Sequence, residues 1–151
     1  MKSKIMRGLL IMLVLPFPLS ASLGGDVASV QADQAKMQGS LRSTSNNSYT
    51  VHEIQASTGI DVKEYASPSG KVFAITWQGP SHPDLRQLLG PYFGQYEQAA
   101  QAQVAQRRGH GPVLIQLPGL VVQLAGHMRS FVGRAYVPQM LPAGVHAEDV
   151  R

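Results

Sequence analysis

The sequence contains no cysteine, and this absence excludes disulfide bonds, thiolate metal sites and a cysteine nucleophile. It also excludes a lipid anchor that needs a cysteine at the mature terminus. Charged residues are scarce, at 15% of the chain, whereas hydrophobic residues make up 44% of the 151 positions. This content is enough for one domain of ordinary size to bury a core. Because no disulfide bond can form, the folded protein depends on that core.

A strong positive charge is also lacking, although the formal net charge is +4. Three basic residues, Lys2, Lys4 and Arg7, lie in a segment that we expect to be removed. Without these three, 10 of the 13 basic residues remain against 9 acidic ones, which gives a net charge of +1. A nearly neutral protein offers no electrostatic basis for binding nucleic acid.

Residues 1–22 have the form of a secretory signal peptide. A basic start precedes an apolar run over residues 8–15, and small residues follow at positions 20–22. The apolar run is shorter than the roughly 20 residues that a membrane-spanning helix needs, and no later stretch resembles a membrane span. An uncleaved anchor is the alternative. The segment predicts export, cleavage near Leu23 and a periplasmic or secreted protein with no membrane span.

The composition divides the remaining chain into three parts. Residues 23–48 are rich in Gly, Ser, Gln, Ala and Asn and end in a polar tract without periodicity, which predicts a flexible leader. A single α+β domain is expected over residues 49–145, with its first strand at residues 49–56. Residues 146–151 are expected to form a tail.

A hairpin is the clearest structural signal in the sequence. Ser67-Pro68-Ser69-Gly70 suits a type I turn, and the segment after it is rich in the β-branched and aromatic residues that suit strands. Burial favours a four-residue loop that pairs Val62 with Ile75. A three-residue loop with a bulge at Gly70 is the alternative.

The favoured register gives the hairpin one apolar face. Its members are Ile60, Val62, Phe73, Ile75 and Trp77, with Glu64 near the end, whereas Val72 lies on the other face. A helix is expected to start near Ser81 and to cover the apolar face, because apolar residues recur after it at three- and four-residue spacings. The helix residues expected to pack on the hairpin are Leu85, Leu88, Leu89, Phe93 and Tyr96.

The second half of the sheet is expected from two patterns. Apolar runs at residues 113–117 and 120–124 flank Pro118-Gly119, and Gly126 is expected to turn the chain into a last strand at residues 127–137. The sequence therefore predicts an α+β fold with an antiparallel sheet of about five strands. One long helix, kinked or split at Pro91, is expected on one face of the sheet. The pattern does not give the strand order.

Five runs of residues resemble a known family in combination. They are residues 63–65 (KEY), 72–80 (VFAITWQGP), 84–90 (DLRQLLG), 126–129 (GHMR) and 133–138 (GRAYVP). Together they resemble a proteobacterial family of exported proteins catalogued as a domain of unknown function, number twenty-eight forty-four in that series. The resemblance spans about residues 49–145 and implies bacterial origin and export. It implies no activity, cofactor or catalytic residue.

Motifs of known chemistry are absent from the sequence. The five histidines, His52, His82, His110, His127 and His146, show no spacing typical of metal ligands. No Gly-x-Ser-x-Gly elbow is present, and a pairing of Glu53 with Glu64 rests on conjecture. Residues 109–112 are Gly-rich but follow a helix, so they do not predict a phosphate site. The sequence indicates no catalytic residue, metal or cofactor, and it favours a protein that is not an enzyme.

The candidate binding residues lie in two segments. Trp77 and His82 leave the central hairpin, and His127 and Arg129 open the expected last strand. Trp, His and Arg anchor ligands by stacking and by charge-assisted hydrogen bonds. For Trp77, packing under the helix is the favoured alternative. If the two segments neighbour each other, His82, His127 and Arg129 are predicted to border one exposed patch.

These observations predict a small exported binding or interaction protein of the bacterial envelope. Its expected partner is an envelope protein or a polysaccharide. Two alternatives stay open: an envelope enzyme of unrecognised type, and a structural or assembly factor without a ligand. A pocket with converging polar groups would favour the enzyme, and a shallow exposed patch would favour the binding protein.

Overall fold

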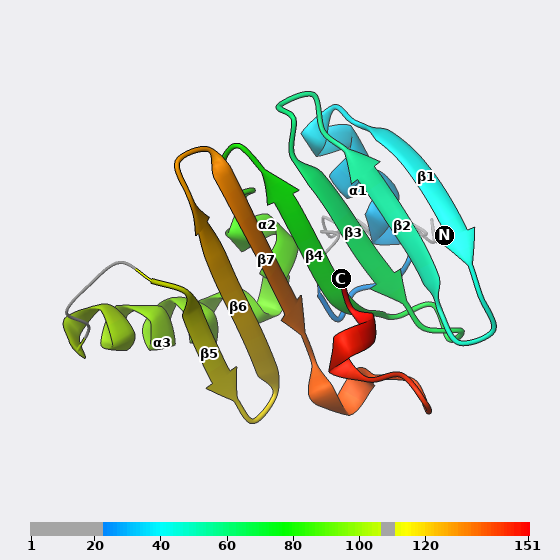
Figure 1. Cartoon of the computed structure of the whole chain (residues 1–151). Helices are drawn as coiled ribbons and strands as arrows, with labels where there is room; N and C mark the ends of the chain where they lie inside the picture. The colour runs from blue at the N-terminus through cyan, green and yellow to red at the C-terminus, as the bar shows by residue number, and fades with distance from the viewer. Residues whose placement is uncertain (1–22, 107–110) are drawn as a thin grey trace, which may run out of the picture.

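The computed structural model describes residues 23–106 and 111–151, so the expected signal peptide lies outside the described residues. One antiparallel sheet of seven strands, in the order β1-β2-β3-β4-β7-β6-β5, forms its centre (Figure 1). The strands are β1 (Ser40–Ser45), β2 (Thr50–Gln55), β3 (Asp61–Ala66), β4 (Val72–Gly79), β5 (Val113–Leu117), β6 (Leu120–His127) and β7 (Ser130–Tyr136). The α+β class is confirmed, whereas the expected number of about five strands is too low.

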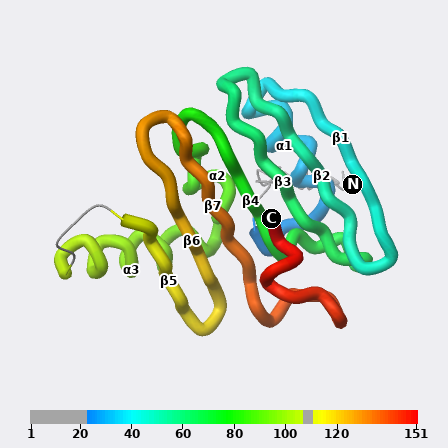
Figure 2. The backbone as a smooth tube through the Cα atoms, viewed as in Figure 1, coloured from blue at the N-terminus to red at the C-terminus, as the bar shows by residue number. Residues whose placement is uncertain are grey.

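The two faces of the sheet are covered differently. Helices α1 (Ala28–Met37), α2 (Leu85–Leu89) and α3 (Phe93–Gln106), with the 3₁₀ turn η1 (Gly90–Tyr92), lie on one face, which we call the helix face (Figure 1). The last part of the chain, with the 3₁₀ turns η2 (Pro138–Met140) and η3 (Ala147–Asp149), crosses the opposite face, which we call the tail face (Figure 2). The tail covers one part of that face and leaves another part open.

Residues 23–48, expected as a flexible leader, instead contain α1 and β1. The backbone N–H of Leu23 donates to the Leu88 carbonyl at 2.9 Å, and the Leu23 side chain is fully buried. Strand β1 pairs with β2 along its whole length, yet five of its six residues are exposed. Its pattern therefore lacks the alternation by which a strand is recognised. Backbone pairing, which the sequence pattern does not report, places this strand.

The expected long helix is present with an interruption at Pro91. Its N-cap is Asp84, not Ser81: the Asp84 carboxylate accepts from the backbone N–H of Arg86 at 3.0 Å and of Gln87 at 3.2 Å. Pro91 lies in the turn η1, which joins α2 to α3 directly. Because proline has no backbone N–H, a tight 3₁₀ turn at this point relieves the missing α-helical bond.

The central hairpin has the predicted turn but a different register. The backbone N–H of Gly70 donates to the Ser67 carbonyl at 2.8 Å, which closes the four-residue turn. Val62 pairs with Trp77, so the favoured pairing of Val62 with Ile75 is wrong. Two shifts of one residue add up to this difference. Beside the turn, Ala66 pairs with Val72 and not with Lys71, and a bulge between Tyr65 and Ala66 then shifts the register once more.

The bulge exchanges two side chains between the faces. Val72 joins the core on the helix face, whereas Phe73 packs on the tail face with Tyr65. The ring centroids of Phe73 and Tyr65 are 6.2 Å apart. The prediction that Phe73 packs under the helix is therefore wrong. The rest of the predicted contact is confirmed, since Val62 and Ile75 share one cluster with Leu88, Leu89 and the other helix residues.

The β5–β6 hairpin is confirmed, whereas the next turn comes later than expected. Strand β6 continues through Gly126 to His127, which pairs with Ser130. Met128 and Arg129 form the turn with positive φ values of 39° and 70°, a backbone form that suits tight hairpins. The last strand therefore starts at Ser130, and Arg129 lies in the turn before it.

The end of the chain, of which residues 146–151 were expected to lie outside the domain, closes a second hydrophobic cluster. Val145 and Val150 are buried against Tyr65, Phe73 and Ala74 on the tail face. The helix face holds the larger cluster, built mainly from the central strands and α2. The folded unit therefore extends from Leu23 to Arg151 and not only over residues 49–145.

Candidate functional site

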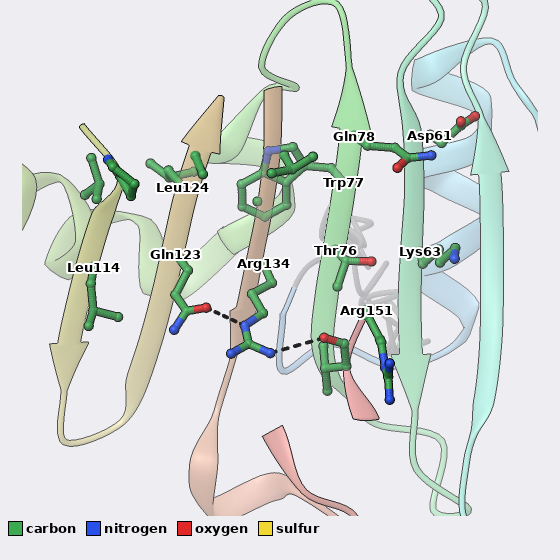
Figure 3. Close-up of a pocket in the computed structure, with 16 residues that line it drawn as sticks. Asp61, Lys63, Thr76, Trp77, Gln78, Leu114, Gln123, Leu124, Arg134 and Arg151 are labelled. Atoms are coloured by element: carbon green, nitrogen blue, oxygen red, sulfur yellow. Dashed lines mark hydrogen bonds between the residues drawn. The ribbon is translucent and has the colours of Figure 1, made fainter. Parts of the chain in front are cut away.

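The open part of the tail face contains a groove across five adjacent strands. The pairing of β3, β4, β7, β6 and β5 places the side chains of Lys63, Thr76, Arg134, Gln123 and Leu114 in one row. These five residues line a groove with a volume of about 520 Å³ (Figure 3). Strand alternation puts them on the face away from the helices.

The tail forms one wall of this groove through contacts with Arg134. The guanidinium Nη1 donates to the carbonyls of Ala147 at 2.7 Å and Val150 at 3.3 Å. Its Nε donates to the side-chain oxygen of Gln123 at 2.6 Å. These bonds fix the guanidinium in the middle of the groove, with Val150 and Arg151 beside it.

The two ends of the groove differ in chemistry. Lys63 and Arg151 lie at one end and Leu114 at the other (Figure 3). Leu124 also borders the groove, but its side chain alternates with Gln123 and packs against the cluster on the helix face. Leu114 is 44% exposed, a large exposure for an apolar strand residue. The ion pairs of the described residues are Lys71 with Asp26 and Arg86 with Glu97. The cations of the groove therefore have no ion-pair partner in the described part of the chain.

Trp77, one of the predicted site residues, is buried in the cluster on the helix face and also borders the groove. Its side chain is 3% exposed, which agrees with the favoured alternative of a packing role. Its ring lies over Gly133, the paired residue on β7, where an added Cβ would come within 2.2 Å of Trp77 Cζ2. Gly133 therefore provides the space for the indole ring. The indole N–H is buried and has no hydrogen-bond partner among the described residues.

The other predicted residues lie at one end of the β4–β7 pair. The rings of His82 and Phe131 are 4.5 Å apart, so the predicted neighbourhood of the two segments exists. His82 also lines a second hollow, of about 400 Å³, next to α2, and neither His127 nor Arg129 lines it. Alternation along β7 puts Phe131 and Ser130, the partner of His127, on opposite faces. A patch shared by His82, His127 and Arg129 stays a prediction.

A cluster of buried titratable groups lies between the sheet and α1. Asp33 of α1 and Glu64 of β3 are both fully buried, and neither Glu64 oxygen has a hydrogen-bond partner in the described structure. Burial, followed by the charge of Asp33, raises the pKa of Glu64 to about 9. Burial also raises the pKa of Asp33 to about 6, against the opposing hydrogen bond from Gln87. Because both carboxyls are buried away from water and lie close together, ionising both of them would cost much free energy.

His52 adjoins this cluster, because it pairs with Glu64 across the β2–β3 ladder. Its Nδ1 lies 2.7 Å from the Ser43 hydroxyl, and burial lowers its pKa. The conjectured pairing of Glu53 with Glu64 is wrong, since Glu53 pairs with Lys63 and points to the opposite face. Asp33, Glu64 and His52 line neither of the two hollows described above. A ligand bound in either hollow would therefore not touch these three residues.

Sequence reasoning missed most of the groove. One signal was present: the polar residues Thr76, Gln123 and Arg134 each interrupt an apolar stretch of a strand. Assembling them needs the strand order, because β7 lies between β4 and β6. Asp33 was missed because it lies within residues 23–48, which were expected to form a flexible leader and instead contain α1.

Two kinds of feature are absent from the described residues. No group of three or more His, Cys, Asp or Glu side chains among them is arranged to hold a metal ion. None of the described helices is long and apolar enough to cross a membrane.

A comparison with known families gives one match. The family described as "Protein of unknown function (DUF2844)" matches residues 19–150, which is most of the chain, so the chain belongs to this family. Comparisons with curated proteins and with solved structures found no match. The chemistry of the groove therefore has to be argued from its own residues.

Proposed function

We propose that this DUF2844 protein is an exported binding protein that holds a small ligand in the groove on the tail face. One observation carries the proposal: the groove combines exposed apolar side chains with cations that have no ion-pair partner among the described residues. Its volume of about 520 Å³ lies in the usual range for small-molecule sites, roughly 300–1,000 Å³. Exposed apolar side chains that line a hollow are a common sign of a binding site.

Binding is favoured over catalysis by the chemistry of the lining. General acid–base catalysis needs a group that exchanges protons, and nucleophilic catalysis needs a nucleophile beside a base. The described groove residues include one carboxylate, Asp61, and one hydroxyl, Thr76, but no histidine. The lysine and arginines of the groove contribute charge and hydrogen bonds, but they do not form a nucleophile–base pair with another described lining residue.

Export is supported by the first 22 residues, which have the basic, apolar and small-residue parts of a signal peptide. Leu23 is buried and hydrogen bonded in the fold, so cleavage well beyond this residue would remove core contacts. Mass spectrometry of the native protein is expected to find a terminus near Leu23. A soluble cytosolic protein that starts at Met1 would contradict export.

A neutral dye tests whether the groove binds apolar compounds. Nile red is expected to gain fluorescence with the wild-type protein, because Leu114 and Val132 offer it an apolar surface. Val132→Asp is expected to weaken Nile red binding about tenfold, since it puts a charge on that surface. Fluorescence titration measures both affinities.

Val104→Asp is the matched control. Val104 is 74% exposed on α3, against 46% for Val132 on β7, and it does not line the groove. Thermal melting checks that both variants are folded. A modest loss of stability is expected for Val132→Asp alone, because Val132 is about half buried and aspartate is disfavoured in a strand. Equal Nile red binding by the two variants, or no binding by the wild-type protein, would contradict the proposed function.

A further inference from the structure

We infer that the ligand of the groove is a single-chain amphiphile with an anionic head, an inference that rests on the proposed function. The head lies at the end of the groove formed by β3, β4 and the tail. The apolar chain extends across β7 and β6 toward β5. The argument rests on the charge of one end, the apolar character of the other and the order of the strands between them.

The charged end has an excess of cations. Lys63, Arg134 and Arg151 line it, and Asp61 is the one acidic side chain among the described lining residues. Glu53 faces Lys63 from the neighbouring strand, so the charges of these five groups sum to +1. Neither the Lys63 ammonium nor the guanidinium groups of the two arginines form an ion pair among the described residues. An anionic group bound there would gain from all three cations.

Arg134 holds its charge in place without neutralising it. The guanidinium donates to two carbonyls of the tail and to the amide oxygen of Gln123, and none of these acceptors is charged. Its position is therefore fixed before a ligand arrives, and this lowers the entropy cost of binding. The tail also carries Arg151, whose backbone N–H donates to the Tyr65 hydroxyl at 3.1 Å. One segment thus positions two of the three cations.

The opposite end of the groove suits a hydrocarbon chain. Leu114, Ala125 and Val132 come from β5, β6 and β7, three neighbouring strands. Strand alternation puts the side chains of all three on the tail face. The polar row and this apolar surface meet at Gln123 and Arg134, in the middle of the groove (Figure 3). A ligand that is charged at one end and apolar along its body matches this order, whereas a uniformly polar ligand would leave Leu114 and Val132 in contact with polar groups.

A polysaccharide fits the groove less well. Sugar rings bind by stacking on exposed aromatic side chains that also offer a polar edge. Trp77 is the aromatic residue that lines the groove, and its side chain is 3% exposed. The described residues of the lining offer no exposed aromatic face on which a sugar ring could stack.

Displacement of Nile red by ten-carbon compounds tests the inference. Decanoate and decyl phosphate carry anionic heads, decyl alcohol is neutral and decyltrimethylammonium is cationic, while all four share the same chain. Both anions are expected to displace the dye at concentrations at least about tenfold lower than the alcohol and the cation. The ratio between decanoate and decyl phosphate shows whether the head is a carboxylate or a phosphate.

A charge-removing variant tests the position of the head. Lys63→Gln/Arg151→Gln is expected to weaken decanoate binding about tenfold at low salt and to leave binding of decyl alcohol unchanged. The control, Arg42→Gln/Arg129→Gln, removes the same charge from exposed positions outside the groove. It is expected to bind decanoate like the wild-type protein.

The outcomes separate the inference from the proposed function. If the alcohol or the cation displaces Nile red as well as decanoate does, the inference is wrong while the binding groove stands. If both double variants lose decanoate affinity equally, the effect is one of net charge and the head is not at the groove. If Nile red itself does not bind, the proposed function fails.

Discussion

Raising the pH from about 5 to about 9 is expected to lower the free energy of unfolding by about 3 kcal/mol or more, because Glu64 holds a proton in the folded state. Burial and the nearby Asp33 raise the pKa of the Glu64 carboxyl from 4.5 to about 9. Urea unfolding at a series of pH values measures the effect.

The sign follows from proton uptake. Between the unfolded and folded pKa values of Glu64, the folded protein binds a proton that the unfolded chain releases. Stability therefore falls as the pH rises through this interval. Asp33 acts in the same direction over a lower range, because its pKa is raised to about 6. In acid, neither carboxyl destabilises the fold, because each is then protonated in both the folded and the unfolded state.

His52 opposes this trend at the acid end. Burial lowers its pKa below the ordinary value of 6.5, so the unfolded chain binds a proton that the folded protein does not. Stability is then lost as the pH falls below about 6.5.

Two further charges act on Asp33. Lys36 of α1 lowers the pKa of Asp33, and Asp84 at the start of α2 raises it. The stability maximum is therefore expected on the acid side of neutrality.

Glu64→Gln separates the carboxyl from the rest of the cluster. Glutamine has the shape of the protonated acid but cannot ionise, so the variant should lose most of the decline above about pH 6. At about pH 8 it is expected to be more stable than the wild-type protein by about 2 kcal/mol. Glu53→Gln is the matched control, because Glu53 lies on the neighbouring strand and points to the tail face. A wild-type profile that is flat or rises toward pH 9 would refute the prediction.

Phe73→Ala is expected to lower the free energy of unfolding by about 3–5 kcal/mol, because the side chain is fully buried. Such a loss is a large share of the 5–15 kcal/mol that is typical of a small domain, to an order of magnitude. The cost arises in the tail-face cluster, where the ring contacts Tyr65 and Tyr49 with centroid distances of 6.2 and 6.1 Å. Urea unfolding measures the loss.

Double-mutant cycles identify the face on which Phe73 packs. Phe73→Ala and Val150→Ala are expected to couple by about 0.5–3 kcal/mol, because the two residues share one cluster. Phe73→Ala and Leu88→Ala should be nearly additive, since Leu88 belongs to the cluster on the helix face. Coupling to Leu88 instead of Val150 would show that the bulge is misplaced.

Local signals determined several parts of this fold. The turn at Ser67-Gly70 and the apolar spacing of α2 and α3 depend on residues close together in the chain, and both are present as expected. The central apolar face was predicted for the same reason, apart from Phe73. Membership of the DUF2844 family could also be recognised from short runs of sequence.

Other parts depend on contacts between distant residues. The bulge beside Tyr65 moves Phe73 to the tail face, and the tail then covers it through Val145 and Val150. The polar strand β1 is placed by its backbone pairing with β2, because its side chains carry no burial pattern. In both cases the stabilising contacts are made with residues far away in the sequence, so the local pattern of residue types does not predict them.

The groove shows the same division at the level of function. The sequence by itself determined the residue types: single polar side chains within apolar strands, and no cysteine or catalytic motif. Only the tertiary structure decided that β7 lies between β4 and β6, so that Arg134 stands between Thr76 and Gln123. The physical reason is that strand order depends on backbone hydrogen bonds and on packing across the whole sheet. These are shared by all strands and belong to no single segment.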